Sequence, residues 1–490
     1  MRTEVWLAVA VAFSLTPAAA QIPDAASSAS TTSANTPFTP AVPSTTAPAV
    51  SPEIQQYFDK NILFKDRIRH SFSMRQAVGG QDTVDCIQDD SPPPPVPPSP
   101  PTTIPPSSLP PVPGLLSNTT QDRTIDSLGR IRACPAGTFG QVRPSISELA
   151  PYRTVAEFAY AQAMSHRLSS GSPQQAAPTL QSTGYNHGVA AQYVNNWGMS
   201  SDISFQNPML NYQNRDPYPV SEHSLSQLWL VGDYPEPTQA LPSDLQTIEI
   251  GWEQTYWQQQ EGLTPALFIY SSWNNYLGSC YNGGCGSTGP THWKLLDTSY
   301  TYGAAISVAP YTWPSYSLPN HGVFAIYGSK PDGYWYVYII NEWVGYFWFD
   351  SGPLSRSNLQ NGYVPSNFIE IGGEVFEGRP TSPPLSIPSG TIHPYIQMGR
   401  GANVSVNMYN DYWNFDNNAF SACNYYLDGS GNWQVASPAT SITHASGTWT
   451  GVERPDCYQV YLQSNYRSPV TTPYLLFGGP GPSGSSCTTY

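Results

Sequence analysis

The chain is poor in charge, and above all in positive charge. Charged residues make up 11% of its 490 residues, and 20 Lys and Arg stand against 34 Asp and Glu, so the net charge is −14. Non-specific binding of nucleic acid needs clustered Lys and Arg, so this class of function is excluded. A chain with few bases also gains little positive self-repulsion when its carboxylates are protonated, and this composition suits an acidic environment.

Most familiar catalytic motifs are missing as well. The sequence has no G-x-S-x-G, no H-E-x-x-H, no C-x-x-C and no nucleotide-binding glycine motif. It therefore gives no support for a nucleophile elbow, a standard zinc site or a nucleotide cofactor, and we expect neither metal nor cofactor. The eight histidines are dispersed. His223 could serve a catalytic triad, but a lone surface or core histidine is the simpler interpretation.

Long apolar runs occur only at the start of the chain. Residues 1–20 combine Arg2, an apolar run and Ala18-Ala19-Ala20, which is the pattern of a secretory signal peptide. No later stretch approaches the ~20 apolar residues of a membrane span, so we expect an exported protein that is not held in a membrane. Its seven cysteines should then be largely disulfide-bonded. Asn118 and Asn403 lie in glycosylation sequons.

The N-terminal part is expected to consist of unlike segments. Residues 21–50 are rich in Ala, Ser, Thr and Pro and should be disordered. Ser51-Pro52-Glu53 resembles an N-cap followed by proline and predicts a helix, and a capping box at Thr154 predicts a second helix that ends near Leu168. Between these helices, thirteen of the 23 residues 91–113 are proline, as in a stiff polyproline II spacer or a ligand for a proline-recognising partner.

The pattern changes after a polar, exposed connector at residues 169–182. From residue 183 to 490 the chain shows short aromatic or β-branched runs bounded by Gly, Pro, Asn or Asp, which predict strands. The clearest runs are 227–231, 267–270, 323–327 and 334–340. Many short strands without interleaved helices favour an antiparallel β-sandwich or barrel. We therefore expect an all-β chain in which a β-sandwich follows a small, helix-containing N-terminal part.

Carboxylates in strands are the chemistry that remains. Glu249 lies in an apolar, strand-like run, and Glu370, Glu374 and Glu377 lie in a second run that contains Gly372-Gly373. Alternation puts Glu370 and Glu374 on one face about 13 Å apart, and the glycine pair invites a bulge or a close backbone approach. Each glutamate taken alone is expected to face solvent. Together they make general acid/base hydrolysis the leading chemical hypothesis.

The motifs resemble, in order, those of the neprosin family of glutamic prolyl endopeptidases. Those from residue 224 onward are Ser224-Leu225-Ser226-Gln227-Leu228-Trp229, Ile248-Glu249-Ile250-Gly251-Trp252, Gly278-Ser279-Cys280-Tyr281-Asn282, Gly345-Tyr346-Phe347, Gly372-Gly373-Glu374-Val375 and Gly478-Gly479-Pro480-Gly481. Two further motifs resemble the family's activation peptide: Thr83-Val84-Asp85-Cys86-Ile87 and Cys134-Pro135-Ala136-Gly137-Thr138. The long proline insert is a departure from the family.

This resemblance implies a secreted zymogen that cleaves beside proline in acid, with Glu249 and Glu374 as the catalytic dyad. Its partners would be proline-containing peptides or proteins, with its own propeptide, residues 51–168, as inhibitor of the catalytic part, residues 183–490. The resemblance also implies three disulfides, Cys86–Cys134, Cys280–Cys285 and Cys457–Cys487, which leave Cys423 free. We expect a monomer. The candidate substrate-binding residues are Gln227, Trp229, Trp252 and Tyr281, because a proline ring needs an apolar pocket.

Two other functions fit the same residues. Paired carboxylates with aromatic platforms also serve glycoside hydrolases. A non-catalytic β-sandwich that binds carbohydrate or cell wall would use the aromatic residues for stacking on sugars and the proline insert as an anchor. Assays in acid on a proline-containing peptide and on polysaccharides would separate the three.

Overall fold

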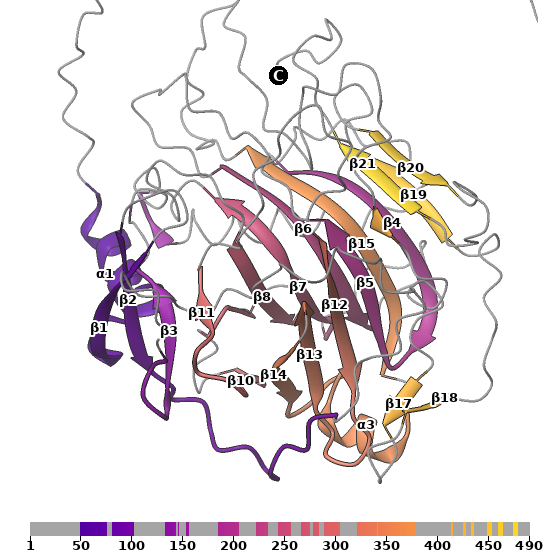
Figure 1. The fold of residues 1–490 in the computed structure, drawn as a ribbon, viewed down its shortest axis with the longest axis horizontal. Coiled ribbons are helices and arrows are strands. Elements are labelled where there is room, and N and C mark those ends of the chain that lie inside the picture. Colours follow the sequence, from indigo (N-terminus) through magenta and orange to yellow (C-terminus); the bar gives the residue numbers. More distant parts are fainter. Residues whose placement is uncertain are drawn as a thin grey trace, which may run out of the picture. The chain divides into compact units, whose positions relative to one another are not determined.

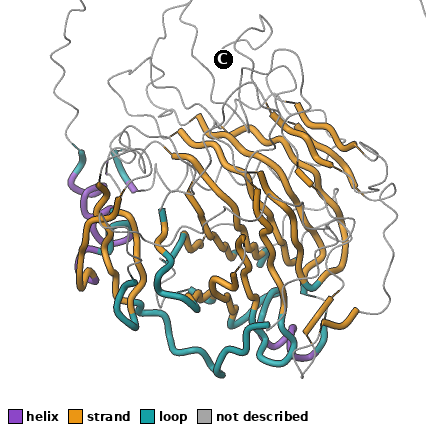
Figure 2. Tube along the Cα trace, in the orientation of Figure 1, coloured by secondary structure: helices purple, strands orange, loops and turns teal. Residues whose placement is uncertain are grey.

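The computed structural model describes part of the chain. The described residues are 50–75, 81–101, 133–143, 146, 153–155, 185–204, 222–233, 244–255, 266–274, 278–283, 289–303, 321–340, 342–363, 365–377, 413–414, 425–427, 433–435, 448–452, 459–463 and 474–478. Strands dominate this part of the chain (Figures 1 and 2).

A seven-stranded antiparallel sheet carries both predicted catalytic glutamates. Its strands, in spatial order, are β19 (Thr448–Val452), β4 (Tyr185–Asn196), β15 (Ser366–Glu377), β6 (Glu222–Gly232), β7 (Gln246–Thr255), β8 (Ala266–Trp273) and β9 (Gly278–Tyr281). Glu249 lies on β7 and Glu374 on β15, with β6 between them.

A second antiparallel sheet has eight strands. They are, in spatial order, β10 (Thr291–Leu295), β14 (Glu342–Phe349), β13 (Trp335–Ile340), β12 (His321–Gly328), β5 (Gly198–Ser204), β16 (Trp413–Asn414), β21 (Tyr474–Gly478) and β20 (Gln459–Gln463). A short helix, α3 (Arg356–Asn361), follows β14, and β17 (Tyr425–Leu427) pairs with β18 (Trp433–Val435).

The two large sheets share one hydrophobic core. Leu228, Ile250 and Ile371 of the first sheet belong to the same buried cluster as Trp335 and Phe347 of the second. Burying one face of each sheet against the other is the way a β-sandwich removes apolar surface from water. The all-β prediction is thus confirmed, and so are the four clearest predicted strands, which fall within β6, β8, β12 and β13–Tyr334. No described helix is both long and apolar enough to cross a membrane.

The N-terminal part contributes a helix and a small sheet. Helix α1 (Pro52–Asn61) begins where the sequence predicted, because the Ser51 hydroxyl accepts a hydrogen bond from the Ile54 N–H and proline occupies the first turn. Ile54 and Phe58 are its buried residues. A 3₁₀ turn, η1 (Lys65–Arg67), leads into a four-stranded sheet in the order β1 (Ile68–Arg75), β2 (Gln81–Gln88), β3 (Thr138–Val142) and β11 (Thr301–Tyr302).

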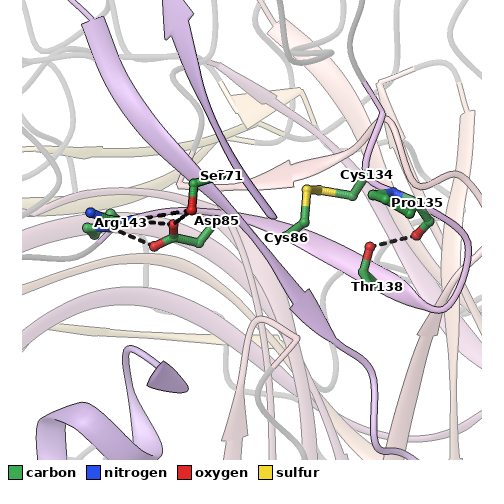
Figure 3. Close-up of a disulfide and its surroundings, with 7 residues drawn as sticks. All are labelled: Ser71, Asp85, Cys86, Cys134, Pro135, Thr138 and Arg143. Carbon is green, nitrogen blue, oxygen red and sulfur yellow. Dashed lines mark hydrogen bonds and ion pairs between the residues drawn. A yellow bond between two sulfur atoms is a disulfide. The ribbon is translucent and has the colours of Figure 1, made fainter. Parts of the chain in front are cut away.

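A disulfide joins Cys86 of β2 to Cys134, just before β3 (Figure 3). This pair was predicted from the family resemblance and is confirmed. On the other side of β2, the buried Asp85 carboxylate accepts hydrogen bonds from the Arg143 guanidinium at 2.6 and 2.8 Å and from the Ser71 hydroxyl at 2.6 Å. The disulfide and the ion pair together hold β1, β2 and β3 in one small sheet.

The small sheet is continuous with the later part of the chain. Strand β3 pairs in parallel with β11, so that Thr301 lies opposite Gly140. An ion pair of 2.6 Å joins Asp89, just after β2, to Lys294 of β10. Residues from Ala47 to Tyr490 accordingly belong to one compact unit.

Several predictions lie outside the described residues and stay predictions. They are the signal peptide 1–20, the segment 21–49, most of the second helix, the connector 169–182, the proline residues beyond 101, the sequons at Asn118 and Asn403, and Cys285, Cys423, Cys457 and Cys487. Cys280 is disulfide-bonded, while its predicted partner Cys285 is among these residues.

Candidate active site

Strand alternation divides β6, β7 and β15 between two environments. Leu228, Ile250 and Ile371 point into the core that the two sheets share. Successive side chains of a strand point to opposite faces, so Glu249 and Glu374 point away from that core. We call this side of the seven-stranded sheet the site face.

One row across the site face holds two glutamates. Trp229 of β6 lies directly between Glu249 of β7 and Glu370 of β15. Both carboxyl groups are buried, with exposed fractions of 2% and 4%. The expectation that each glutamate, taken alone, faces solvent is wrong, because strand alternation tells which residues share a face and not what covers that face.

A second row on the site face, four residues further along the strands, holds two more glutamates. Leu225 lies between Glu253 and Glu374, and both of these carboxyl groups are buried too. Within each row the two glutamates are separated by one strand, which is about 10 Å between Cα atoms, and the rows lie about 13 Å apart. The predicted dyad of Glu249 and Glu374 is therefore a diagonal of this four-glutamate arrangement.

Gln227 lies in the row between the two glutamate rows, flanked by two glycines. Gly251 and Gly372 are its direct neighbours on β7 and β15. A Cβ atom at Gly251 would meet the Ser226 carbonyl oxygen at 2.0 Å, and one at Gly372 would meet the Gly188 carbonyl oxygen at 2.3 Å. The pairing of β15 continues without a shift through Gly372-Gly373. Of the two expectations for this pair, the bulge is wrong and the close backbone approach is present.

Two histidines hold Glu374. His187 lies opposite it on β4, and its Nε2 is 3.0 Å from Oε2, while Nε2 of His223 on β6 is 3.0 Å from Oε1. Burial raises the pKa of a carboxyl group, but the charge of His187 and the hydrogen bonds from both imidazoles outweigh burial, so the pKa of Glu374 lies well below its usual range. The imidazoles thus favour the ionised form of Glu374 in acid.

His223 is thus neither a lone histidine nor a member of a serine triad, and its interpretation from sequence is corrected. His187 was not anticipated at all. The sequence Tyr185-Asn186-His187 carries no motif, and only the pairing of β4 with β15, nearly two hundred residues later in the chain, brings this imidazole to Glu374.

Glu249 has different neighbours. Its Oε1 accepts a hydrogen bond of 2.8 Å from the Thr247 hydroxyl, which lies 2.9 Å from the Ser272 hydroxyl. The neutral Thr247 hydroxyl thus helps to orient the Glu249 carboxyl group, whereas two imidazoles hold Glu374. Such unlike surroundings are how proteins give two carboxyl groups different protonation behaviour.

Tyr270 of β8 connects the two predicted catalytic glutamates electrostatically. Burial raises the pKa of its phenol far above the usual range, and the negative charges of Glu249 and Glu374 both add to this shift, while a hydrogen bond with Ser279 opposes it. Strand pairing places Tyr270 directly opposite Glu249. Tyr270 is a site residue that sequence reasoning missed.

The structure separates the four predicted substrate-binding residues. Gln227 and Trp229 lie on the site face, between the glutamates. Tyr281 of β9 pairs with Tyr270 and packs with it against the apolar residues of that face. Trp252 is fully buried in the core on the other side of β7, so its assignment to the substrate site is corrected: alternation places it with Ile250 and not with Glu249.

No group of three or more His, Cys, Asp and Glu side chains among the described residues is arranged to hold a metal ion. The chemistry that these side chains can perform is proton transfer between carboxyl groups, imidazoles and water.

Comparison with known proteins gives one family. The sequence pattern of the family described as Neprosin matches residues 220–480, which include β6, β7, β8 and β15 and both predicted catalytic glutamates. No curated protein matches the chain. The chain therefore belongs to the neprosin family and is, at the level of the family, a neprosin-type peptidase.

Proposed function

We propose that the chain is a secreted glutamic endopeptidase that hydrolyses peptide bonds next to proline in acid, with Glu249 and Glu374 as its catalytic pair. The observation that carries this proposal is the contrast between the two carboxyl groups. Glu374 is held as a carboxylate by His187 and His223, while the neutral Thr247 hydroxyl donates a hydrogen bond to Glu249 on the same face.

The contrast assigns roles. Glu374, as the ionised group, takes a proton from a water molecule, and the water oxygen attacks the carbonyl carbon of the scissile bond. Protonated Glu249 gives its proton to the departing nitrogen as the C–N bond breaks. Glu374 then carries the proton and Glu249 the charge, and exchange with solvent restores both. Acid solution supplies the proton that the role of Glu249 requires.

The middle row of the site face suits a peptide between the two groups. Gly251 and Gly372, on either side of Gln227, bring only backbone to this row, and in this proposal the scissile peptide bond and the attacking water bind along the diagonal between the glutamates once the site has opened. The Gln227 amide, whose carbonyl oxygen is buried and without a hydrogen-bond partner among the described residues, is the group that we propose contacts the substrate backbone.

The zymogen part of the proposal is supported by burial. In the full chain the Glu249 and Glu374 side chains are only 2% exposed, so a peptide reaches them only after part of the chain moves. The N-terminal part is attached to the rest through β3–β11 pairing and through the ion pair of Asp89 with Lys294. Acid protonates carboxylates and so weakens ion pairs of this kind.

The test is an incubation of the purified full-length chain at about pH 3, where carboxyl chemistry operates, with a proline-containing peptide and, separately, with polysaccharides. We expect cleavage next to proline, and self-conversion to a shorter form that begins between about residues 165 and 185. A Glu249→Gln chain should convert far more slowly. Release of sugars without peptide cleavage would instead support a glycosidase built on Glu249 and Glu370, which flank Trp229.

A further inference from the structure

The outward side of the second sheet is lined with aromatic rings. Alternation sends Trp335 and Phe347 into the shared core and sends Tyr336, Tyr346 and Trp348 to the opposite side. There they form a buried cluster with Tyr334, which directly precedes β13. We call the side formed by Tyr334, Tyr336, Tyr346 and Trp348 the aromatic face.

The rings of the aromatic face pack closely with one another. The ring centroid of Tyr346 lies 4.9 Å from that of Tyr334 and 5.9 Å from that of Trp348, and Tyr336 lies 5.8 Å from Tyr346. Aromatic pairs at these separations attract one another beyond the area they bury. The result is an apolar surface whose edge carries tyrosine hydroxyls and the Asp332 carboxylate, which accepts hydrogen bonds from the Tyr336 hydroxyl at 2.6 Å and from the Ser99 N–H at 3.4 Å.

The chain's own proline-rich segment, residues 91–101, lies on this surface. We call it the proline strap; in Figure 1 its purple trace leaves β2 and runs below β10 and β14. Val96 of the strap packs against the aromatic cluster. At the start of the strap, Lys294 of β10 contacts the Asp89 carboxylate at 2.6 Å and the Ser91 carbonyl oxygen at 3.2 Å.

Every backbone N–H of residues 92–101 is used in this contact. Proline has no N–H, and Val96 and Ser99 are the two residues of that run that are not proline. The Val96 N–H donates to the Tyr334 hydroxyl at 3.0 Å, and the same hydroxyl donates to the Val96 carbonyl oxygen at 2.6 Å. The Ser99 N–H donates to the Tyr336 hydroxyl at 2.7 Å.

The chain bends at residues 95 and 96, and from Val96 onward the two contacts have the sequence spacing of a turn of a polyproline II helix. Val96 and Ser99 are three residues apart, which is one turn of such a helix. The hydrogen bonds from the strap to the tyrosine hydroxyls use only backbone atoms of Val96 and Ser99, so these bonds do not depend on which side chains the two residues carry. A different proline-rich chain with two other residues at this spacing would make the same hydrogen bonds.

We propose that the aromatic face is a binding site for proline-rich polypeptides, that the strap occupies it in the precursor, and that a proline-rich stretch of substrate occupies it once the strap has left. Aromatic surfaces with hydroxyl groups at their edge are a recurrent means of recognising proline-rich chains, whose stiffness lowers the entropy lost on binding. The binding site stands on the contacts above, and only its use for substrate rests on the proposed function. The site would hold long proline-rich chains on the enzyme while bonds elsewhere in them are cut.

The test is a binding measurement in the full-length chain, made in a Glu374→Gln background so that peptide is not consumed. Fluorescence anisotropy follows a labelled peptide with the sequence of residues 89–101. The strap is loosened by Val96→Pro with Ser99→Pro, which removes both N–H donors and keeps the segment proline-rich. We expect the loosened chain to bind the peptide at least about tenfold more tightly than the chain with the native strap, because the competing segment has lost two hydrogen bonds.

Two controls test the mode of binding. In the loosened chain, Tyr334→Phe and Tyr336→Phe should each weaken binding about fivefold through a lost hydrogen bond, while Tyr338→Phe, on the same side of β13, should leave it unchanged. A peptide with serine in place of every proline should bind at least tenfold more weakly. Near-ultraviolet circular dichroism checks folding, and Ser99→Pro alone, with an intermediate expected effect, replaces the double variant if that variant unfolds.

The proposal is overturned if the loosened chain binds the peptide no better than the native chain, or if the native and proline-free peptides bind equally. Because no catalytic turnover is measured, such a result would leave the proposed peptidase activity untouched. Conversely, absence of peptidase activity would leave the binding result standing.

Discussion

The two large sheets use the sides that point away from their shared core in different ways. The site face of the seven-stranded sheet carries four buried glutamates with imidazoles and hydroxyls among them. The aromatic face of the eight-stranded sheet carries tyrosine and tryptophan rings. Both arise from the same alternation of side chains along a strand, so the difference lies in which residue types the sequence places at the positions that avoid the core.

The partners of the two sides differ accordingly. A buried carboxylate is costly unless charge or hydrogen bonds compensate it, and on the site face such partners come from the same sheet: His187 and His223 from the strands beside Glu374, and Thr247 from the strand of Glu249 itself. Aromatic rings need shielding from water but no compensating charge. On the aromatic face, the proline strap provides part of this shielding. The first side is suited to proton transfer and the second to docking a chain.

The largest expected effect is a loss of stability when a side chain is added at Gly251, where two strand backbones approach closely at the centre of the site face. Gly251→Ala should destabilise the protein by about 3 kcal/mol or more, since its Cβ would lie 2.0 Å from the Ser226 carbonyl oxygen. Gly345→Ala is the matched change on the second sheet, where the Cβ would lie 2.4 Å from the Lys294 carbonyl oxygen. The thermal unfolding temperature should fall for both variants. Activity per folded molecule should fall only for Gly251→Ala, and an equal fall for Gly345→Ala would contradict the separation of the two sides.

A smaller effect is expected from His187. Removing this imidazole by His187→Gln takes away charge and a hydrogen bond that lower the pKa of Glu374, so that pKa rises. The acidic limb of the kcat/KM profile should then move to higher pH by about one unit or more. The stability that ionised Glu374 contributes above the pKa of an unfolded glutamate, and that is lost as pH falls, should also decrease.

His292→Gln provides the control on the second sheet. His292 lies 2.8 Å from Asp350 and its ring packs on Trp348, away from the glutamates. Its replacement should leave the pH profile unmoved. A shift as large as that of His187→Gln would show that the profile reports general stability and not the ionisation of Glu374.

The smallest effect concerns the attachment of the N-terminal part. Asp89→Asn removes the charge that faces Lys294, and because this pair is only partly buried its loss is worth about 1 kcal/mol. Self-conversion in acid should become a few times faster, as measured by the rate at which the shorter form appears on a gel. Asp59→Asn, whose partner Lys65 lies within the N-terminal part, should not change the rate. Equal acceleration by both changes would contradict the role of the Asp89 contact.

Much of the fold could be predicted from local patterns. The strands at 227–231, 267–270 and 323–327 followed from aromatic and β-branched runs between turn residues, and the start of α1 followed from serine before proline. Local patterns say little about the N-terminal strands β1 to β3 or about the parallel pairing of β3 with β11, because these join segments far apart in the chain.

The candidate active site likewise has some features that local sequence patterns predict and others that they do not. Glu249 and Glu374 were found through motifs that lie within single strands, and their shared face follows from the pairing of β6 with both β7 and β15. The imidazole of His187, the phenol of Tyr270 and the burial of all four glutamates depend on which strands become neighbours. Long-range register has no local signature, so these features could be seen only in the folded chain.

The most direct test of the diagonal pair is a comparison of four single variants: Glu249→Gln, Glu253→Gln, Glu370→Gln and Glu374→Gln. Each keeps the shape of the side chain and removes one titrating group, and kcat on a proline-containing peptide is measured in acid on protein whose folding has been verified. We expect Glu249→Gln and Glu374→Gln to lower kcat at least about a hundredfold, and the other two to lower it less than about tenfold. Loss confined to both members of one row, Glu249 with Glu370 or Glu253 with Glu374, would contradict the assignment.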